Sequence, residues 1–71
     1  MECKEKICSL LLKTLQATRK YSDLVSLEYT GADGAEEEYV CAKYSHGGWV
    51  KINVTGDSGI ALIADVLGGL A

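Results

Sequence analysis

The amino-acid sequence predicts an α+β domain with the element order α-β-β-β-α, in which two helices pack on one face of a three-stranded antiparallel meander. Three observations support this prediction. Between residues 24 and 54, three runs rich in β-branched and aromatic residues are separated by two Gly-rich turns. An amphipathic stretch with helical periodicity precedes these runs, and an apolar stretch of helical character follows them. We therefore expect a single domain that spans residues 1–71.

The first helix is predicted over residues 3–21, where apolar residues recur with a period of about 3.6 residues. This stripe comprises Cys3, Ile7, Leu10, Leu11 and Leu15, with Thr14 and Thr18 on the same side. Leu12 and Cys8 lie beside the stripe, toward its polar side. They either cover the edge of the sheet or contact a partner.

The first strand is predicted over residues 24–30, with Val25, Leu27 and Tyr29 inward by simple alternation. Residues 31–34 read as a hairpin turn, because glycine supplies the positive φ that tight connections need.

The second strand is predicted over residues 37–44, and its register is ambiguous. One pairing buries Val40, Ala42 and Tyr44, whereas the other buries Tyr39 and Cys41. A slip of one residue turns every side chain to the other face, so both pairings stay open at this point.

The third strand is predicted over residues 49–54, after a second turn at residues 45–48. The side chains of Val50, Ile52 and Val54 are expected to point inward. Alternation then places Trp49 on the opposite face, together with Lys51 and Asn53.

The second helix is predicted over residues 60–67, with Asp57 or Ser58 as its N-cap and Gly68-Gly69 as its end. Ile60, Ile63, Ala64 and Leu67 form one stripe, and Leu62 and Val66 project from another side. A helix that is apolar nearly all round is expected to be covered on more than one side.

Composition excludes several classes of protein. Seven basic residues against ten acidic ones give a net charge of −3 without a basic stripe, so direct binding of nucleic acid is not expected. Three cysteines without a Cys-x-x-Cys pair, and one histidine, predict neither a metal site nor a disulfide, and we expect no cofactor. Reduced thiols and the lack of a signal sequence or of about 20 consecutive apolar residues indicate a cytoplasmic protein outside the membrane.

Residues 56–59, Gly-Asp-Ser-Gly, are similar to the motif around the nucleophilic serine of chymotrypsin-like proteases. Such a serine needs a base within hydrogen-bond reach, and His46 is the only histidine, so we interpret Ser58 as a helix cap and expect no enzyme activity. The same turn is a weak candidate anion site through Gly56, Ser58 and Gly59, although Asp57 places a negative charge there.

Two further groups of residues are candidates for partner binding. The first is aromatic and consists of Trp49 with Tyr39 and Tyr44, since Trp and Tyr are enriched at protein interfaces. The second is acidic. It comprises Glu36, Glu37 and Glu38, which form either a solvated strand end or a patch for a basic partner. Surplus apolar surface at Leu12, Leu62 and Val66 predicts self-association, as a homodimer.

The element order resembles that of the double-stranded RNA-binding domain across nearly the whole chain. That family has a lysine cluster at the start of its second helix, where this chain has Asp57, Ser58 and Gly59, so the resemblance does not extend to RNA binding. Residues 52–65 also resemble small uncharacterised proteins of phages and mobile elements of gut Firmicutes. This second resemblance implies a non-catalytic accessory protein, for example one that inhibits a host defence or nucleic-acid-handling enzyme.

The sequence thus favours a small protein–protein interaction module that self-associates. The alternative is a small-molecule binder, in which a nucleotide-sized ligand lies near Trp49 and residues 56–59, in a pocket between sheet and helices or at a dimer seam.

Overall fold

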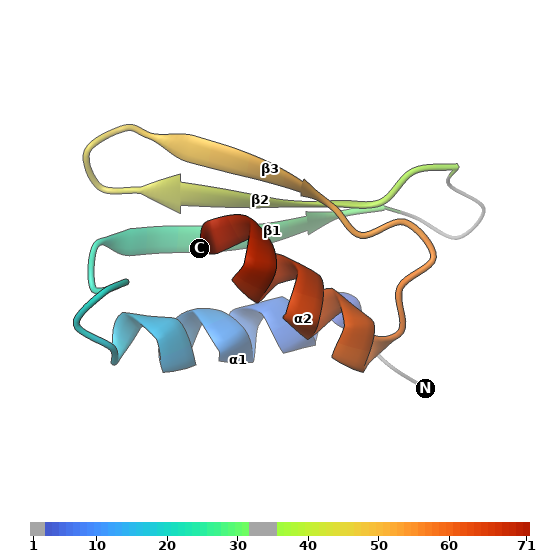
Figure 1. The fold of residues 1–71 in the computed structure, drawn as a ribbon, viewed down its shortest axis with the longest axis horizontal. Helices are drawn as coiled ribbons and strands as arrows, with labels where there is room; N and C mark the ends of the chain where they lie inside the picture. The colour runs from blue at the N-terminus through green and yellow to red at the C-terminus, as the bar shows by residue number, and fades with distance from the viewer. Residues whose placement is uncertain (1–2, 32–35) are drawn as a thin grey trace.

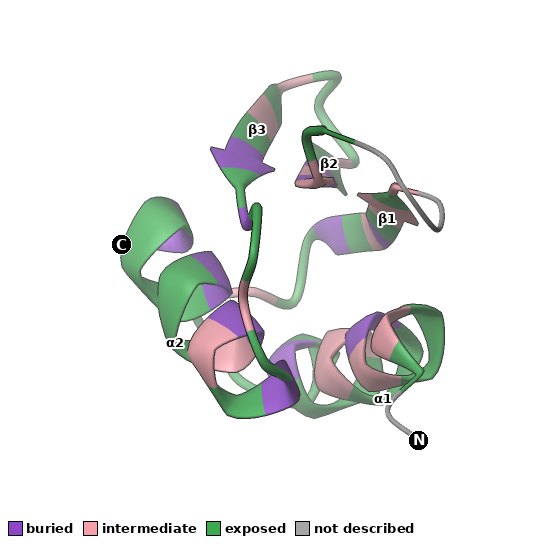
Figure 2. Ribbon diagram, turned by 90° about the vertical axis from the view of Figure 1, so that its right-hand side faces the viewer, coloured by how far each residue is buried: buried purple, intermediate pink, exposed green. Residues whose placement is uncertain are grey.

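The computed structural model describes residues 3–31 and 36–71 and contains the predicted α-β-β-β-α order. Its elements are α1 (Lys4–Gln16), β1 (Leu24–Thr30), β2 (Tyr39–Tyr44), β3 (Trp49–Asn53) and α2 (Gly59–Leu70). The strands form one antiparallel sheet in the order β1-β2-β3 (Figure 1). Both helices lie on the same side of this sheet, so the molecule has two layers (Figure 2). The predicted hairpin turn at residues 31–34 falls largely outside the described residues.

The register of β2 places Val40 and Ala42 in the core, where both are fully buried. Val40 lies opposite Ile52 of β3, and Ala42 lies opposite Leu27 of β1. The first of the two possible pairings is therefore correct. Cys41 and its neighbours of the same parity face away from the helices.

The side-chain alternation predicted for β1 is wrong at its start. Leu24 is buried and Val25 is 54% exposed, because the pairing with β2 shifts by one residue between Leu24 and Ser26. This irregularity is a β-bulge, which inserts one extra residue into a strand and reverses the facing of the residues before it. Beyond the bulge, Leu27 and Tyr29 point inward as predicted.

Helix α1 is shorter than predicted, and of the predicted stripe Ile7, Leu11 and Leu15 pack in the core, whereas Cys3 and Leu10 do not. It ends at Gln16, and the hydroxyl of Thr18 donates a hydrogen bond of 2.6 Å to the carbonyl of Leu15 at this end. Cys8 and Leu15 are its buried residues, whereas Leu10 is exposed. Leu12 is half-buried and packs against the core, so it covers the sheet instead of forming spare outer surface.

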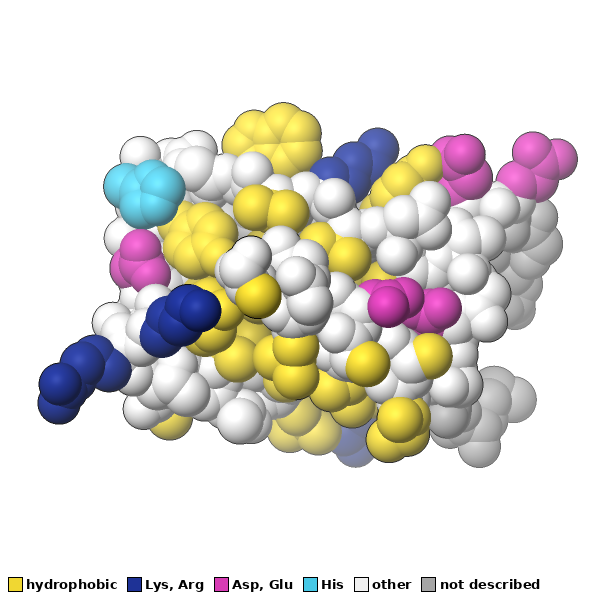
Figure 3. All heavy atoms as spheres, viewed as in Figure 1, with side chains coloured by type: hydrophobic (Ala, Val, Ile, Leu, Met, Phe, Trp, Pro, Cys, Tyr) yellow, Lys and Arg dark blue, Asp and Glu magenta, His cyan; other side chains and the backbone are white. Residues whose placement is uncertain are grey.

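The self-association prediction is also wrong for Leu62 and Val66, which lie on α2. Leu62 and Val66 are both 0% exposed, because the side of α2 that carries them faces β3 and α1. A partner cannot contact these two side chains in the folded chain. Hydrophobic side chains do gather on the outer surface over α2 (Figure 3), but they belong to other positions of the helix.

The two glycines near the end of α2 do not terminate it. The helix continues through Gly68 and Gly69 to Leu70, which is buried. A Cβ atom at position 69 would lie 2.7 Å from Cγ1 of Ile52, so glycine allows the last turn to approach β3 closely. Gly69 therefore allows close packing on β3 and does not end the helix.

One hydrophobic core fills the space between the sheet and the helices. Its buried residues are Cys8, Leu15, Leu24, Leu27, Val40, Ala42, Ile52, Val54, Leu62, Val66 and Leu70.

Candidate functional site

The face of the sheet that points away from the helices is open and carries the only tryptophan of the chain. We call it the outer sheet face. It comprises Ser26, Glu28, Thr30, Tyr39, Cys41, Lys43, Trp49, Lys51 and Asn53, which the strand register places on one side. Trp49 is 64% exposed, and Val50, Ile52 and Val54 point to the other side, as predicted. The indole is thus presented to solvent on a regular strand.

Two lysines accompany the aromatic side chains of the outer sheet face. Nζ of Lys51 lies 3.9 Å from the centroid of the Tyr39 ring, a cation–π contact that holds the lysine over β2. Nζ of Lys43, which pairs with Trp49 across the strands, lies 3.8 Å from Oε2 of Glu28. Lys43 is therefore the cross-strand neighbour of the indole, whereas Lys51 reaches toward Tyr39, which pairs with Asn53 at the other end of β3.

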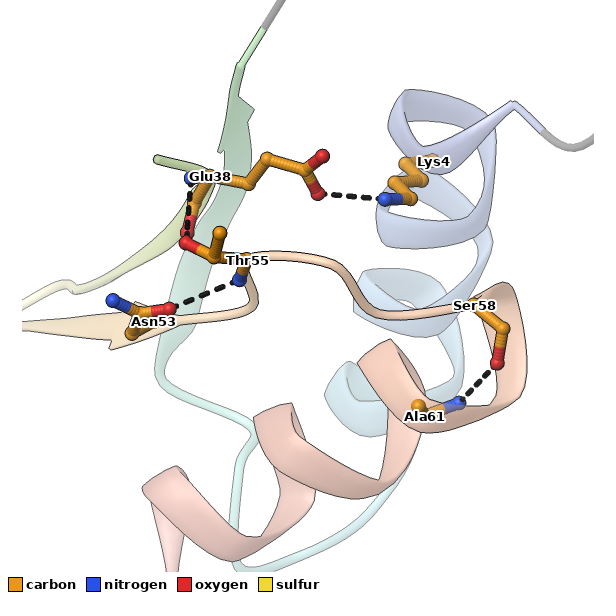
Figure 4. A network of polar contacts seen from close by, with 6 residues as sticks. All are labelled: Lys4, Glu38, Asn53, Thr55, Ser58 and Ala61. Carbon is orange, nitrogen blue, oxygen red and sulfur yellow. Dashed lines mark hydrogen bonds and ion pairs between the residues drawn. The ribbon is translucent and has the colours of Figure 1, made fainter. Parts of the chain in front are cut away.

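The acidic run divides into an internal part and an external part. Oε2 of Glu38 lies 2.6 Å from Nζ of Lys4, and the Glu38 backbone N–H donates to Oγ1 of Thr55 at 2.9 Å (Figure 4). The carboxylate of Glu38 raises the pKa of Lys4, because the hydrogen bond favours the charged ammonium. Glu38 thus ties the start of α1 to the sheet, and it is not part of an open acidic patch.

Glu36 and Glu37 are exposed at the entrance to β2. The hydroxyl of Tyr39 donates a hydrogen bond to the carboxylate of Glu37, which raises the pKa of Tyr39. Glu37 is thereby connected to Tyr39 and Lys51 on the outer sheet face, at the end of the strands opposite Trp49.

Tyr44 does not join Trp49, because it lies on the inner side of β2 and is half-buried. Its ring stacks on His46 with 5.5 Å between the centroids, and burial raises the pKa of Tyr44. Nδ1 of His46 accepts a hydrogen bond from the Gly48 backbone N–H, and Nε2 lies 3.9 Å from Oδ2 of Asp23. These contacts fasten the β2–β3 turn to the start of β1, and Ser58 lies far along the chain from them.

The turn that precedes α2 brings Asp57 close to Asp65 of the helix. Oγ of Ser58 accepts a hydrogen bond from the Ala61 N–H at 3.3 Å, which is the predicted cap (Figure 4). Gly56 has a φ of +77°, which glycine adopts without strain. The carboxyl group of Asp65 raises the pKa of Asp57, since a proton on one acid hydrogen-bonds the other, and burial raises it further. The two neighbouring carboxyl groups of Asp57 and Asp65 oppose the binding of an anion at this turn.

Asp57 leads to a prediction about pH. Its Oδ2 atom is buried without a hydrogen-bond partner among the described residues. Its pKa in the folded chain lies above the ordinary value of 3.8, so its contribution to stability is complete below pH 3.8 and is lost as the pH rises through the folded-state pKa. We expect Asp57→Asn to raise the thermal midpoint at pH 7, and to raise it less as the pH falls toward 4.

Thermal unfolding of the wild type and the variant between pH 4 and pH 7 measures this effect. Glu36→Gln is the control, because Glu36 is exposed. An Asp57→Asn midpoint that stayed below that of the wild type at pH 7 would contradict the prediction.

The cysteines and acids of the described residues form no group of three or more that could hold a metal ion. Cys8 is buried, which raises the pKa of its thiol, whereas Cys3 is exposed and Cys41 is half-buried on the outer sheet face. Ser58 serves as the cap of α2.

The sequence did not reveal two features of the molecular surface. One is the Lys4–Glu38 pair, whose members are 34 residues apart and which no local pattern connects. The other is the exposed side of α2, at Ile60 and Leu67. The sequence did contain a signal for the second, because α2 is apolar nearly all round.

Comparison of the chain with family models, with curated proteins and with solved structures found no match. Within residues 3–31 and 36–71, neither helix has the length and apolar character that crossing a membrane requires.

Proposed function

We propose that this protein is a non-catalytic interaction module that binds a protein partner through the outer sheet face around Trp49. The observation that carries the proposal is the 64% exposure of this indole on a regular strand. An aromatic side chain offers on the order of 150–250 Å² of surface. At about 25 cal/mol per Å², covering the exposed part of the indole would contribute roughly 3 kcal/mol to binding.

The surroundings of Trp49 indicate the character of the partner. Lys43 lies opposite it on β2, and Lys51 lies two residues along β3. A partner segment with an apolar side chain for the indole and a carboxylate for a lysine would complement both features. This differs from the basic partner expected from the acidic run, since Glu38 is already paired with Lys4.

The outer sheet face also separates this proposal from the small-molecule alternative. Trp49 begins β3 and points away from the helices, whereas residues 56–59 follow the other end of β3. Five strand residues span roughly 16 Å. The indole and the turn therefore do not line one pocket between the sheet and the helices.

The test compares proteins retained from a lysate of the native host by the wild type, by Trp49→Ala and by Leu10→Ala. We expect a partner that the wild type and Leu10→Ala retain and that Trp49→Ala loses, because Leu10 is exposed on α1 in the other layer. With the purified partner, we expect Trp49→Ala to weaken binding about 30-fold or more, the effect of losing a hot-spot residue of about 2 kcal/mol. Retention of the same proteins by Trp49→Ala would refute the proposal.

A second measurement uses the single tryptophan as its own probe. Its fluorescence is expected to shift to shorter wavelength when the partner covers the indole. Binding without any change in this emission would place the partner elsewhere. The resemblance of residues 52–65 to phage and mobile-element proteins makes host defence and nucleic-acid-handling enzymes the first candidates to test.

A further inference from the structure

The outward side of α2 consists of apolar residues and glycine, apart from Asp65, which is exposed at its border. We call it the outer α2 face, and its residues are Ile60, Ala61, Ala64, Leu67, Gly68 and Ala71. Ile60 is 77% exposed and Leu67 is 42% exposed. A Cβ atom added at Gly68 would meet nothing within 4 Å, so no other part of the described chain covers this position. Figure 3 shows this side of the molecule, with hydrophobic side chains over α2.

Such a face is unusual for a helix in water. The opposite side of α2 contributes Leu62, Val66 and Leu70 to the core, so the helix is apolar both toward the sheet and toward solvent. Helices that are apolar on all sides are normally covered on all sides. In this chain the core covers only half of α2.

Charge narrows the choice of what covers the outer α2 face. Asp65, at the edge of this face, is the only charged residue of α2. Helices that lie on lipid surfaces carry Lys or Arg beside their apolar side, and α2 has neither. Two copies of a chain with a net charge of −3 repel each other, but they can meet at a face whose only charge, Asp65, lies at the border.

The arrangement of large and small residues is self-complementary. At 100° per residue, Ile60 and Leu67 lie on one flank of a line through Ala64, and Ala61 and Gly68 lie on the other. In an antiparallel pair related by a twofold axis at Ala64, Ile60 of each copy meets Leu67 of the second copy. On the other flank the small residues meet, which lets the helices approach closely. The two helix dipoles are then antiparallel, which is the favourable arrangement.

We propose that the outer α2 face is a self-association surface on which a second copy of this chain packs its own α2 in the antiparallel direction. A single helix presents less than the ~800 Å² per partner of a standard interface, so the dimer is weak and depends on concentration. It uses the helical layer, whereas the proposed partner site uses the outer sheet face. The inference goes beyond the proposed function, and each can fail without the other.

Sedimentation velocity over a concentration series tests the proposal. We expect the wild-type mass to rise from one chain toward two between micromolar and millimolar concentration. We expect Ile60→Glu to raise the dissociation constant at least tenfold, a change of about 1.4 kcal/mol, because it covers an unpaired charge with Leu67 of the second copy. Leu67→Glu is a second variant with the same expected result.

Leu10→Glu is the matched control, since Leu10 is an exposed leucine on α1, and it should leave the mass unchanged. Trp49→Ala should also dimerise as the wild type does. A wild-type mass of one chain at all concentrations would overturn the proposal. Dimers that persist in both glutamate variants would overturn it as well.

Cross-linking tests the geometry. In a background with Cys3 and Cys41 replaced by serine, and with Cys8 buried, Ala64→Cys is expected to form a disulfide-linked dimer in a glutathione redox buffer. Thr14→Cys, at an exposed position of α1, is the control and should stay monomeric. Equal cross-linking of the two variants would contradict the twofold arrangement at Ala64.

Discussion

Replacing Leu62 with alanine is expected to lower the free energy of unfolding by about 3 kcal/mol, the middle of the range for a buried leucine. The side chain is 0% exposed and belongs to the helix that packs on β3. The loss combines the transfer of the removed atoms to water with the cavity that remains. For a domain of this size it corresponds to a fall of roughly 15 °C in the thermal midpoint.

Leu67→Ala is the matched control for this substitution, because it removes the same atoms from the same helix. Leu67 is 42% exposed, so we expect a loss of less than about 1 kcal/mol. Thermal and urea unfolding of both variants, followed by circular dichroism, measures the difference. Equal losses for Leu62→Ala and Leu67→Ala would show that α2 packs on the sheet by another side.

Leu24→Ala is expected to have a similarly large effect, with a loss of about 3 kcal/mol. Leu24 is buried below the sheet at 1% exposure, directly before the bulge. Val25→Ala is the control, and we expect it to cost less than about 1 kcal/mol because Val25 is largely exposed. Simple alternation along the strand predicts the opposite order, so urea unfolding of these two variants decides whether the bulge is present.

The bulge shows why the sequence predicted the strands but not the side of the sheet to which every side chain points. Alternation assumes one residue per pleat, and an extra residue at Val25 leaves no mark in the order of apolar side chains. At Trp49 the same rule succeeded, because β3 pairs regularly with β2 along its whole length. The register of β2 depended on its neighbours Ile52 and Leu27, which only the folded sheet brings opposite it.

The helices were predicted in number and place, but their orientation about their own axes was not. Residues 7–12 of α1 contain only one residue that is not apolar, so two different stripes fit the helical period. In the folded chain Leu15 of the predicted stripe is buried, but Cys8 is buried in place of Leu10, which is exposed. In α2 the same ambiguity led to a wrong assignment. Leu62 was expected on the outer surface but is buried, and Ile60 is exposed instead.

The candidate site was predictable where it depends on local periodicity and unpredictable where it depends on distant contacts. The outward indole follows from alternation alone. The different roles of Glu38 and of the exposed Glu36 and Glu37 do not follow from the sequence, because Glu38 pairs with Lys4 on another element. The separation of Tyr44 from Trp49 followed once the register of β2 was known.

The sheet has two outer strands, β1 and β3, and each has only one strand neighbour among the described residues. Such borders can recruit further chains into growing fibrils. Here the bulge between Leu24 and Ser26 interrupts the hydrogen-bonding row of β1, and β3 is only 5 residues long and carries Lys51 at its centre. Both borders are thus poor templates for fibril growth, which leaves the molecule free to display an exposed indole at high concentration without polymerising through its strands.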